Sequence, residues 1–153
     1  MLKNLNPMLT PELLYVLRAM GHGDELVLVD SNFPAESSAV QTVHGNLIRL
    51  DGNTIAEVAE AVLSVFPLDS FVEHPLLYME VVGKPNEMLE VHRDFKTIVD
   101  NHSDRNWKMA SIERFAFYER AKQAYAIVAT TERKPYGNFV LVKGVINPEG
   151  HVV

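Results

Sequence analysis

Two residues next to one apolar segment carry side chains suited to proton transfer and to binding polar groups. His22 stands between two glycines, and Asp30 directly follows the apolar residues 26–29. Histidine exchanges its proton near neutral pH, and glycines allow a ligand to approach the backbone closely. A continuous apolar run is typical of a buried strand, and ligands of open α/β sheets bind at the carboxyl ends of strands. The pair therefore indicates a polar pocket.

His22 and Asp30 stand at opposite ends of this predicted strand, which limits how they could share one site. His22 must either loop back over the sheet or face a neighbouring subunit. Both residues also have a purely structural explanation. His22 could be a polar loop residue beside the end of a helix, and the Asp30 carboxylate could cap the turn at residues 31–34. The residues alone leave these alternatives open.

Two later segments contain polar residues that could contact a ligand. Arg114 lies in residues 112–120, where charged residues flank three aromatic residues that cannot share one face of a helix. These charged side chains could equally form a solvated helix face. Tyr136, Gly137 and Asn138 form the second candidate, for which the alternative is the geometry of a turn before a strand. Both segments are candidates for a ligand site on this basis.

The composition excludes several classes of protein. The chain has 153 residues and no cysteine, which excludes disulfides, thiolate nucleophiles and zinc–thiolate sites. Its formal net charge of −6 argues against a nucleic-acid partner, because such a protein needs a basic face. No stretch of roughly eighteen apolar residues occurs, so neither a membrane span nor a membrane partner is expected. Residues 1–7 lack the apolar core of a signal peptide, and a cytoplasmic protein is expected.

The sequence contains no motif for a metal or a phosphate group. The histidines other than His22 are scattered, without a pair at a spacing typical of metal ligands. Glycine-rich phosphate-binding loops and the nucleophile elbow of acyl-transfer enzymes are also absent. We therefore expect no metal and no cofactor, so the chemistry must come from proton-transferring and hydrogen-bonding side chains.

Apolar spacing predicts an alternation of helices and strands along the chain. Thr10 and Pro11 begin the first helix, and Thr54 with Glu57 forms a capping box for another. The predicted helices are residues 10–20, 55–66, 88–99 and 115–124. The predicted strands are residues 26–29, 76–82, 125–129 and 139–142, with a turn or hairpin between 40–43 and 47–50 and a loop at 101–106. Such alternation is typical of a three-layer α/β fold, here as a single domain over residues 1–153.

Taken together, these segments resemble the ribose pyranase and fucose mutarotase family. Near the start, the resemblance lies in the segments PELL at 11–14, MGHGDE at 20–25 and DSNFPA at 30–35. Later in the chain, RFAFYERA at 114–121 and the segment 132–138, which ends in YGN, are similar to the fucose mutarotase branch in particular. The resemblance extends over nearly the whole chain, to about residue 144.

The resemblance implies an α/β/α fold with a mixed, mostly parallel central sheet and a sugar site that works without a cofactor. It implies that His22 is the catalytic acid/base, and the chemistry of ring opening makes Tyr136 the candidate for the second proton-transfer or hydrogen-bonding partner. It also implies that the sugar is bound by a set of polar residues: Asp30, Arg114, Tyr136, Gly137 and Asn138. Finally, it implies homo-oligomeric rings, either decamers or assemblies based on pentamers, with the site near or across a subunit boundary.

The implied activity is the interconversion of the α and β anomers of a monosaccharide, either L-fucose or a related sugar. An apolar wall for the sugar ring could come from Phe33, Phe117 or Tyr118. The alternatives are a D-ribose pyranase-type activity, a non-catalytic sugar-binding accessory of sugar uptake, and a ring protein with a vestigial pocket. Some fucose mutarotases carry histidines where this chain has Asn32 and Glu36, so the preferred sugar stays open.

Overall fold

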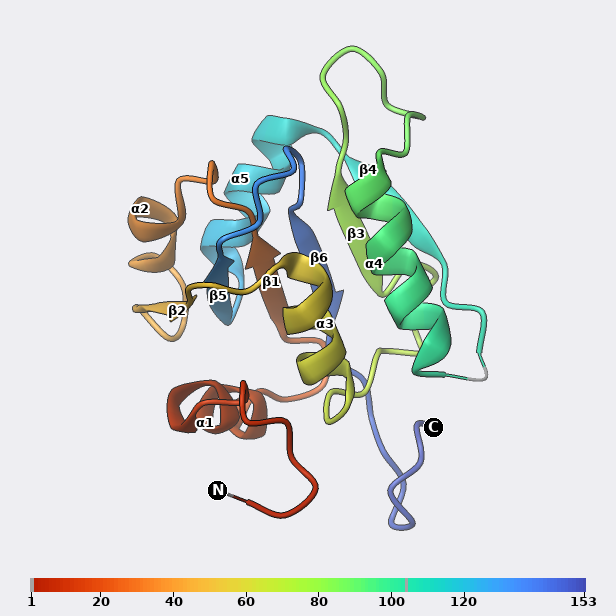
Figure 1. Cartoon of the computed structure of the whole chain (residues 1–153). Coiled ribbons are helices and arrows are strands. Elements are labelled where there is room, and N and C mark those ends of the chain that lie inside the picture. Colours follow the sequence, from red (N-terminus) through yellow and green to blue (C-terminus); the bar gives the residue numbers. More distant parts are fainter. Residues whose placement is uncertain (1, 104) are drawn as a thin grey trace.

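The central sheet is built from six short strands that lie far apart in the sequence (Figure 1). The computed structural model describes residues 2–103 and 105–153. The strands are β1 (Glu25–Val29), β2 (Leu47–Leu50), β3 (Leu76–Met79), β4 (Met109–Ile112), β5 (Ala126–Thr130) and β6 (Phe139–Val142). The helices are α1 (Pro11–Ala19), α2 (Ala35–Ala39), α3 (Ile55–Leu63), α4 (Glu90–Asn101) and α5 (Arg114–Gln123).

The strand order is β2-β5-β1-β6-β3-β4, and β6 runs against both of its neighbours. All the other pairs of neighbouring strands are parallel, which confirms the mixed, mostly parallel sheet. The carboxyl ends of the parallel strands therefore meet the amino end of β6 at one edge of the sheet. We call this the carboxyl edge, which contains Val29, Met79 and Phe139. The opposite amino edge contains Glu25 and Val142.

Both faces of the sheet are covered by helices, because successive side chains of a strand point to opposite faces. Leu26 and Leu28 pack in one cluster with α1, α3 and α4, whereas Val27 and Val29 pack in another with α2 and α5. Full burial of such a side chain contributes about 1.5–3 kcal/mol. The expected three-layer α/β/α arrangement is confirmed (Figure 1).

The local signals that predict helix starts are confirmed. The Thr10 hydroxyl accepts a hydrogen bond from the Leu13 backbone N–H at 3.2 Å and so caps α1. Thr54 and Glu57 form the reciprocal capping box of α3. No helix among the described residues has the length and apolar character needed to cross a bilayer.

Of the turn or hairpin predicted between 40–43 and 47–50, the turn is confirmed and the hairpin is wrong. Residues 40–46 form turns after α2, and β2 pairs in parallel with β5, where Leu47 lies opposite Ile127. The apolar spacing also misses α2 and β4. Helix α2 has five residues, and β4 is a half-buried edge strand without a buried run. The predicted loop at 101–106 starts where α4 ends, and its residue 104 lies outside the described residues.

The core beside β3 and β6 contains a fully buried histidine, His92 of α4. Its ring centroid lies 4.5 Å from that of Tyr78, and it meets Phe139 edge-on at 5.9 Å. Burial lowers the pKa of His92 below its ordinary value of 6.5, the charge of Arg93 lowers it further, and a hydrogen bond with the Tyr136 carbonyl opposes both. His92 is therefore neutral at physiological pH.

We expect His92 to lower the free energy of unfolding in weak acid. Its pKa is lowered in the folded state, so stability that is present above pH 6.5 is lost as the pH falls through this value toward the lowered pKa. His92→Gln lacks this contribution, so the difference in the free energy of unfolding between wild type and this variant shrinks as the pH falls. Denaturant unfolding at about pH 8 and about pH 5 measures both free energies. A difference that stays constant would contradict the expectation.

Candidate functional site

The carboxyl edge of the sheet contains a cavity of about 230 Å³. Its walls come from the residues after β1, from the end of β3, from α5 and from the turn before β6. The lining includes four of the predicted site residues, Asp30, Arg114, Tyr136 and Asn138, together with Asn32, Phe33, Met79, Tyr118 and Pro135. The fold thus brings Asp30 together with Arg114 and Asn138, which lie more than eighty residues further along the chain.

The Asp30 carboxylate organises the base of this cavity. Its Oδ1 accepts hydrogen bonds from the backbone N–H groups of Asn32 at 2.9 Å and Phe33 at 3.1 Å. Its Oδ2 accepts from the Gly137 N–H at 3.0 Å and from Asn138 Nδ2 at 3.1 Å. In return, Asn138 Oδ1 accepts from the Asp30 N–H at 3.1 Å. Each oxygen of the Asp30 carboxylate thus accepts two hydrogen bonds within the protein.

Asp30 therefore has a structural role in the site. The turn-capping explanation is confirmed, because Oδ1 caps the turn at 31–34. At the same time Oδ2 holds the turn before β6, which the sequence could not indicate. Burial raises the pKa of Asp30, and the four hydrogen bonds oppose this rise. Direct binding of a sugar hydroxyl by Asp30 stays a prediction.

Asp30→Asn is expected to destabilise the protein. A carboxamide has a single oxygen, and its NH₂ group would face backbone N–H donors that it cannot satisfy. An unsatisfied buried donor costs about 1–3 kcal/mol, and we expect the free energy of unfolding to fall by this amount. Asp51→Asn, at a carboxylate whose side chain is 61% exposed, is the matched control and should change little. Equal denaturation midpoints for the two variants would contradict this expectation.

The turn before β6 holds Tyr136 in a left-handed conformation, with φ at 64°. Such a conformation costs a residue other than glycine about 1–3 kcal/mol and persists where the surroundings enforce it, often at ligand sites. Gly137 follows in a tight space, where an added Cβ would lie 3.2 Å from both Glu132 Cγ and Val91 Cγ2. The alternative explanation, a turn before a strand, is also confirmed, and this turn lines the cavity.

Arg114 brings an unsatisfied hydrogen-bond donor to the cavity. It is the first residue of α5, whose amino end is capped by the Glu113 carboxylate through the Phe115 N–H at 2.8 Å. The guanidinium carbon lies 4.7 Å from the centroid of the Phe115 ring. Its Nε is buried, and no described residue accepts its hydrogen. Since buried donors are nearly always paired, this N–H is suited to an oxygen atom of a ligand.

The aromatic residues near Arg114 separate into distinct roles. Phe33 and Tyr118 line the cavity and meet edge-on at 5.4 Å, so both can offer an apolar wall. Phe117 is fully buried in the core and does not line the cavity. Phe115 is mostly exposed. The three aromatic residues of α5 thus do point in different directions, as the sequence indicates.

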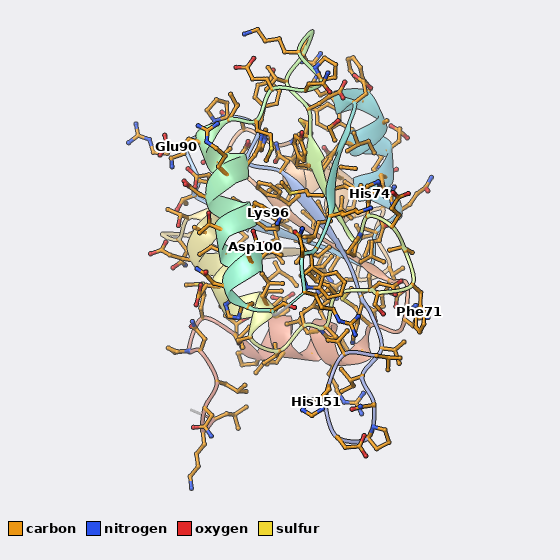
Figure 2. All side chains as sticks on the ribbon, turned by 90° about the vertical axis from the view of Figure 1, so that its right-hand side faces the viewer. Phe71, His74, Glu90, Lys96, Asp100 and His151 are labelled. Carbon is orange, nitrogen blue, oxygen red and sulfur yellow. The ribbon has the colours of Figure 1, made fainter. Side chains whose placement is uncertain are left out.

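His22 lies at the amino edge of the sheet, away from the cavity. Gly23, Asp24 and the five residues of β1 lie between it and Asp30, and the strand alone spans roughly 17 Å. Its Nε2 lies 3.1 Å from Asp69 Oδ2, with the His22 side chain 49% exposed and that of Asp69 2% exposed. Phe71 lies beside it, its ring centroid 5.5 Å from the imidazole, at the surface (Figure 2). His22 does not loop back over the sheet, so within one chain His22 and Asp30 do not share a site.

Asp69 is a candidate that the sequence analysis missed. Its backbone N–H donates to the Val142 carbonyl at the end of β6 at 3.0 Å. This close approach requires Gly144, because a Cβ there would overlap the Leu68 carbonyl. The contact between His22 and Asp69 joins residues 47 positions apart. No local pattern in the sequence signals that distance, so only the fold identifies the pair.

The His22–Asp69 pair is suited to general acid/base catalysis. In the tautomer that donates Nε2–H to Asp69, the second ring nitrogen, Nδ1, is free to accept a proton. A buried carboxylate in this position holds the imidazole and stabilises the imidazolium that forms when the proton is taken up. Because His22 is half exposed, a molecule bound next to the amino edge can reach it.

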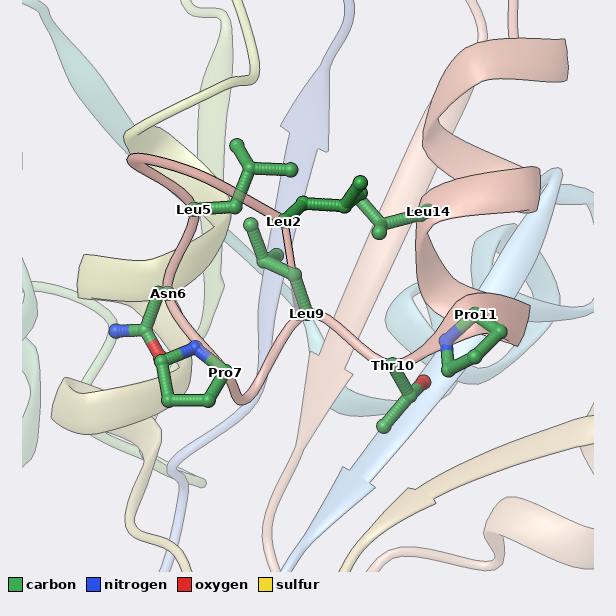
Figure 3. A pocket seen from close by; sticks show the side chains of 8 residues that line it. All are labelled: Leu2, Leu5, Asn6, Pro7, Leu9, Thr10, Pro11 and Leu14. Atoms are coloured by element: carbon green, nitrogen blue, oxygen red, sulfur yellow. The ribbon is translucent and has the colours of Figure 1, made fainter.

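Two further observations add no chemistry to this picture. Figure 3 shows a cavity of about 370 Å³ near the amino terminus, lined by Leu2, Leu5, Asn6, Pro7, Leu9, Thr10, Pro11 and Leu14. None of these side chains titrates or carries a charge. Among the residues that the structure describes, no three potential metal ligands come together.

The chain is similar to known proteins over nearly its whole length. The RbsD / FucU transport protein family matches residues 3–146. An L-fucose mutarotase of Actinobacillus pleuropneumoniae serotype 5b (strain L20) is 44% identical over 147 residues, which cover 95% of this chain and 97% of the relative. A fucose mutarotase of Danio rerio is 47% identical over 154 residues, which cover 97% and 96%. The crystal structure of the fucose mutarotase in complex with L-fucose from Streptococcus pneumoniae matches with a TM-score of 0.85 and 38% identity, covering 95% of this chain and 100% of that one. The resemblance noted in the sequence is confirmed, and the chain belongs to the RbsD / FucU transport protein family.

Proposed function

We propose that this chain, acting as one domain, interconverts the α and β anomers of a monosaccharide, with L-fucose as the first candidate. The observation that carries the proposal is the 44% identity with an L-fucose mutarotase over nearly the full length of both proteins. The geometry supports it, because the cavity offers hydrogen-bonding groups for hydroxyls and His22 pairs with a buried carboxylate. The same chemistry would apply to D-ribose, which is the alternative substrate.

The reaction moves two protons and breaks one carbon–oxygen bond. One proton goes to the ring oxygen and another leaves the anomeric hydroxyl, so the bond between the anomeric carbon and the ring oxygen breaks and an open-chain aldehyde forms. Rotation about the adjacent carbon–carbon bond and the reverse proton transfers close the ring on the other face. In this proposal His22 carries one proton on Nδ1, and Tyr136 is the second partner. Such acid/base catalysis contributes about 10²–10⁴-fold.

The cavity residues bind and orient the sugar in this proposal. Arg114 donates its unpaired Nε–H to a sugar hydroxyl, and Tyr136 contributes its phenol group. Asp30 holds Gly137 and Asn138 in place and shares a carboxylate oxygen with a hydroxyl. Phe33 and Tyr118 of the cavity wall face the apolar side of the sugar ring.

We further propose that the chain forms a homo-oligomeric ring in which each cavity receives His22 from a neighbouring subunit. The cavity and His22 lie at opposite edges of the sheet, so a head-to-tail contact would join the amino edge of one subunit to the carboxyl edge of the next. Repeated head-to-tail contacts of this kind can close into a ring. Phe71, which is 63% exposed beside His22, would be covered in such a contact. Decameric or pentamer-based rings and a cytoplasmic location stay predictions.

The test is the exchange of magnetisation between the α and β anomeric protons at equilibrium, measured by NMR. The wild-type protein should accelerate the exchange of L-fucose above the rate in buffer, and D-ribose is measured in parallel. Saturation-transfer signals from the sugar report binding in the same samples. Binding of L-fucose without faster exchange would overturn the proposal in favour of a non-catalytic sugar-binding protein. Faster exchange of D-ribose alone would replace L-fucose as the substrate.

A further inference from the structure

The amino-terminal half of α4 contacts the turn before β6 at several points. We call this turn, residues 134–138, the cavity turn. Lys134 Nζ lies 2.8 Å from Glu90 Oε1 and 2.8 Å from Asp94 Oδ2. The Val91 side chain packs against Gly137 so closely that a Cβ on the glycine would crowd it. These residues belong to the loop between β5 and β6 on one side and to α4 on the other. The conformation of the cavity turn therefore depends on α4.

His92 makes the contact that reaches the cavity turn itself. Its Nδ1 accepts a hydrogen bond from the Leu89 N–H at 3.1 Å, and its Nε2 lies 3.0 Å from the Tyr136 carbonyl oxygen. A carbonyl can only accept, so Nε2 carries the hydrogen. A neutral imidazole with its proton on Nε2 satisfies both contacts at once. Full burial of His92 favours this neutral form.

The peptide group between Tyr136 and Gly137 is thus held from both sides. A peptide group is planar, so its C=O and its N–H move together. His92 donates to the Tyr136 carbonyl, and Asp30 Oδ2 accepts from the Gly137 N–H at 3.0 Å. The two bonds fix the plane that follows the left-handed Tyr136. Rotation of this plane would turn both Tyr136 and Asn138 out of their positions in the cavity lining.

We propose that His92 is a positioning residue for sugar binding, which acts by holding the Tyr136–Gly137 peptide group so that Tyr136 and Asn138 meet the sugar without reorganisation. The inference rests on the proposed function for its substrate. His92 does not line the cavity, so a sugar bound there would not touch it. Loss of His92 therefore lowers the affinity for the sugar, because part of the binding free energy is then used to order the cavity turn.

The experiment compares three substitutions that separate the two hydrogen bonds of His92. A glutamine amide lies near the position of Nε2, so His92→Gln keeps a donor for Tyr136. His92→Asn places its amide near Nδ1 and keeps only the link to Leu89, and His92→Phe fills the space with neither bond. KM and kcat for L-fucose exchange and Kd from saturation transfer are measured for each. The Asn and Phe variants lose the bond to the Tyr136 carbonyl, which should raise KM and Kd roughly three- to tenfold and leave kcat unchanged. The Gln variant keeps this bond and should be close to wild type.

Val99→Ala is the matched control for loss of core packing. Val99 is buried on the same helix and does not line the cavity, so its truncation should lower Tm and leave KM unchanged. If the Asn and Phe variants lower Tm but keep the wild-type KM and Kd, His92 is a structural core residue and the proposal is overturned. If wild type binds L-fucose without accelerating its exchange, the proposed function fails, and Kd alone decides the role of His92. A wild type that does not bind L-fucose overturns both.

Discussion

His22→Ala is expected to slow catalysed anomer exchange by about 10²–10⁴-fold, the usual contribution of a general acid/base. In the proposed site His22 carries a proton, whereas the residues that line the cavity hold the sugar, so removal of His22 should leave the affinity for the sugar nearly unchanged. Anomeric exchange by NMR gives kcat, and saturation transfer gives Kd on the same sample. If His22→Ala exchanges L-fucose as fast as wild type, the acid/base is a different residue.

Asp69 provides a companion test of the same assignment. Asp69→Asn retains the size of the side chain and removes the charge that stabilises the imidazolium, so kcat should fall while Kd stays unchanged. Asp51→Asn changes the same chemical group at an exposed position and should have no effect on kcat. A normal kcat for Asp69→Asn would mean that His22 works without its carboxylate partner.

The second large effect is expected when two impaired variants are mixed. Arg114→Ala loses a charge-assisted contact with the sugar, which is worth roughly tenfold or more in binding. Its Nε has no partner among the described residues, so the fold should tolerate the change. The two variants are mixed in equal amounts so that their subunits combine at random in each ring. About a quarter of the sites would then pair the intact cavity of a His22→Ala subunit with the intact His22 of an Arg114→Ala neighbour, across a head-to-tail contact. For a tenfold loss of binding, activity measured well below KM should therefore rise to about threefold that of Arg114→Ala alone and far above that of His22→Ala alone.

The controls for this mixing experiment are simple. Each variant is measured alone at the same total concentration, and light scattering establishes the oligomer before and after subunit exchange. If each site were complete within one chain, the mixed rings would contain only impaired sites, and activity would stay at the average of the two variants. That result, or a monomer at micromolar concentration, would overturn the shared site.

The elements that follow from the sequence are those with signals in neighbouring residues. Helix α3 has its capping box at Thr54 and Glu57 and its apolar residues on one face, so both its existence and its start are predictable. Strand β1 is a continuous apolar run because both of its faces are covered. The hairpin alternative at 40–50 is wrong for the opposite reason. β2 finds its partner in β5, about eighty residues further along, and local sequence does not encode that choice.

The site divides in the same way between local and distant causes. The sequence by itself determined the residue types that do the chemistry, the capping of the turn after β1 by Asp30, and the family. The tertiary structure decided which of these residues meet. The antiparallel pairing of β1 with β6 brings Asp30 to Asn138, and the close packing of residues 68–69 on Gly144 places Asp69 beside His22. His22 and the cavity of the same chain lie at opposite ends of β1. The fixed rise per residue of a strand keeps them apart.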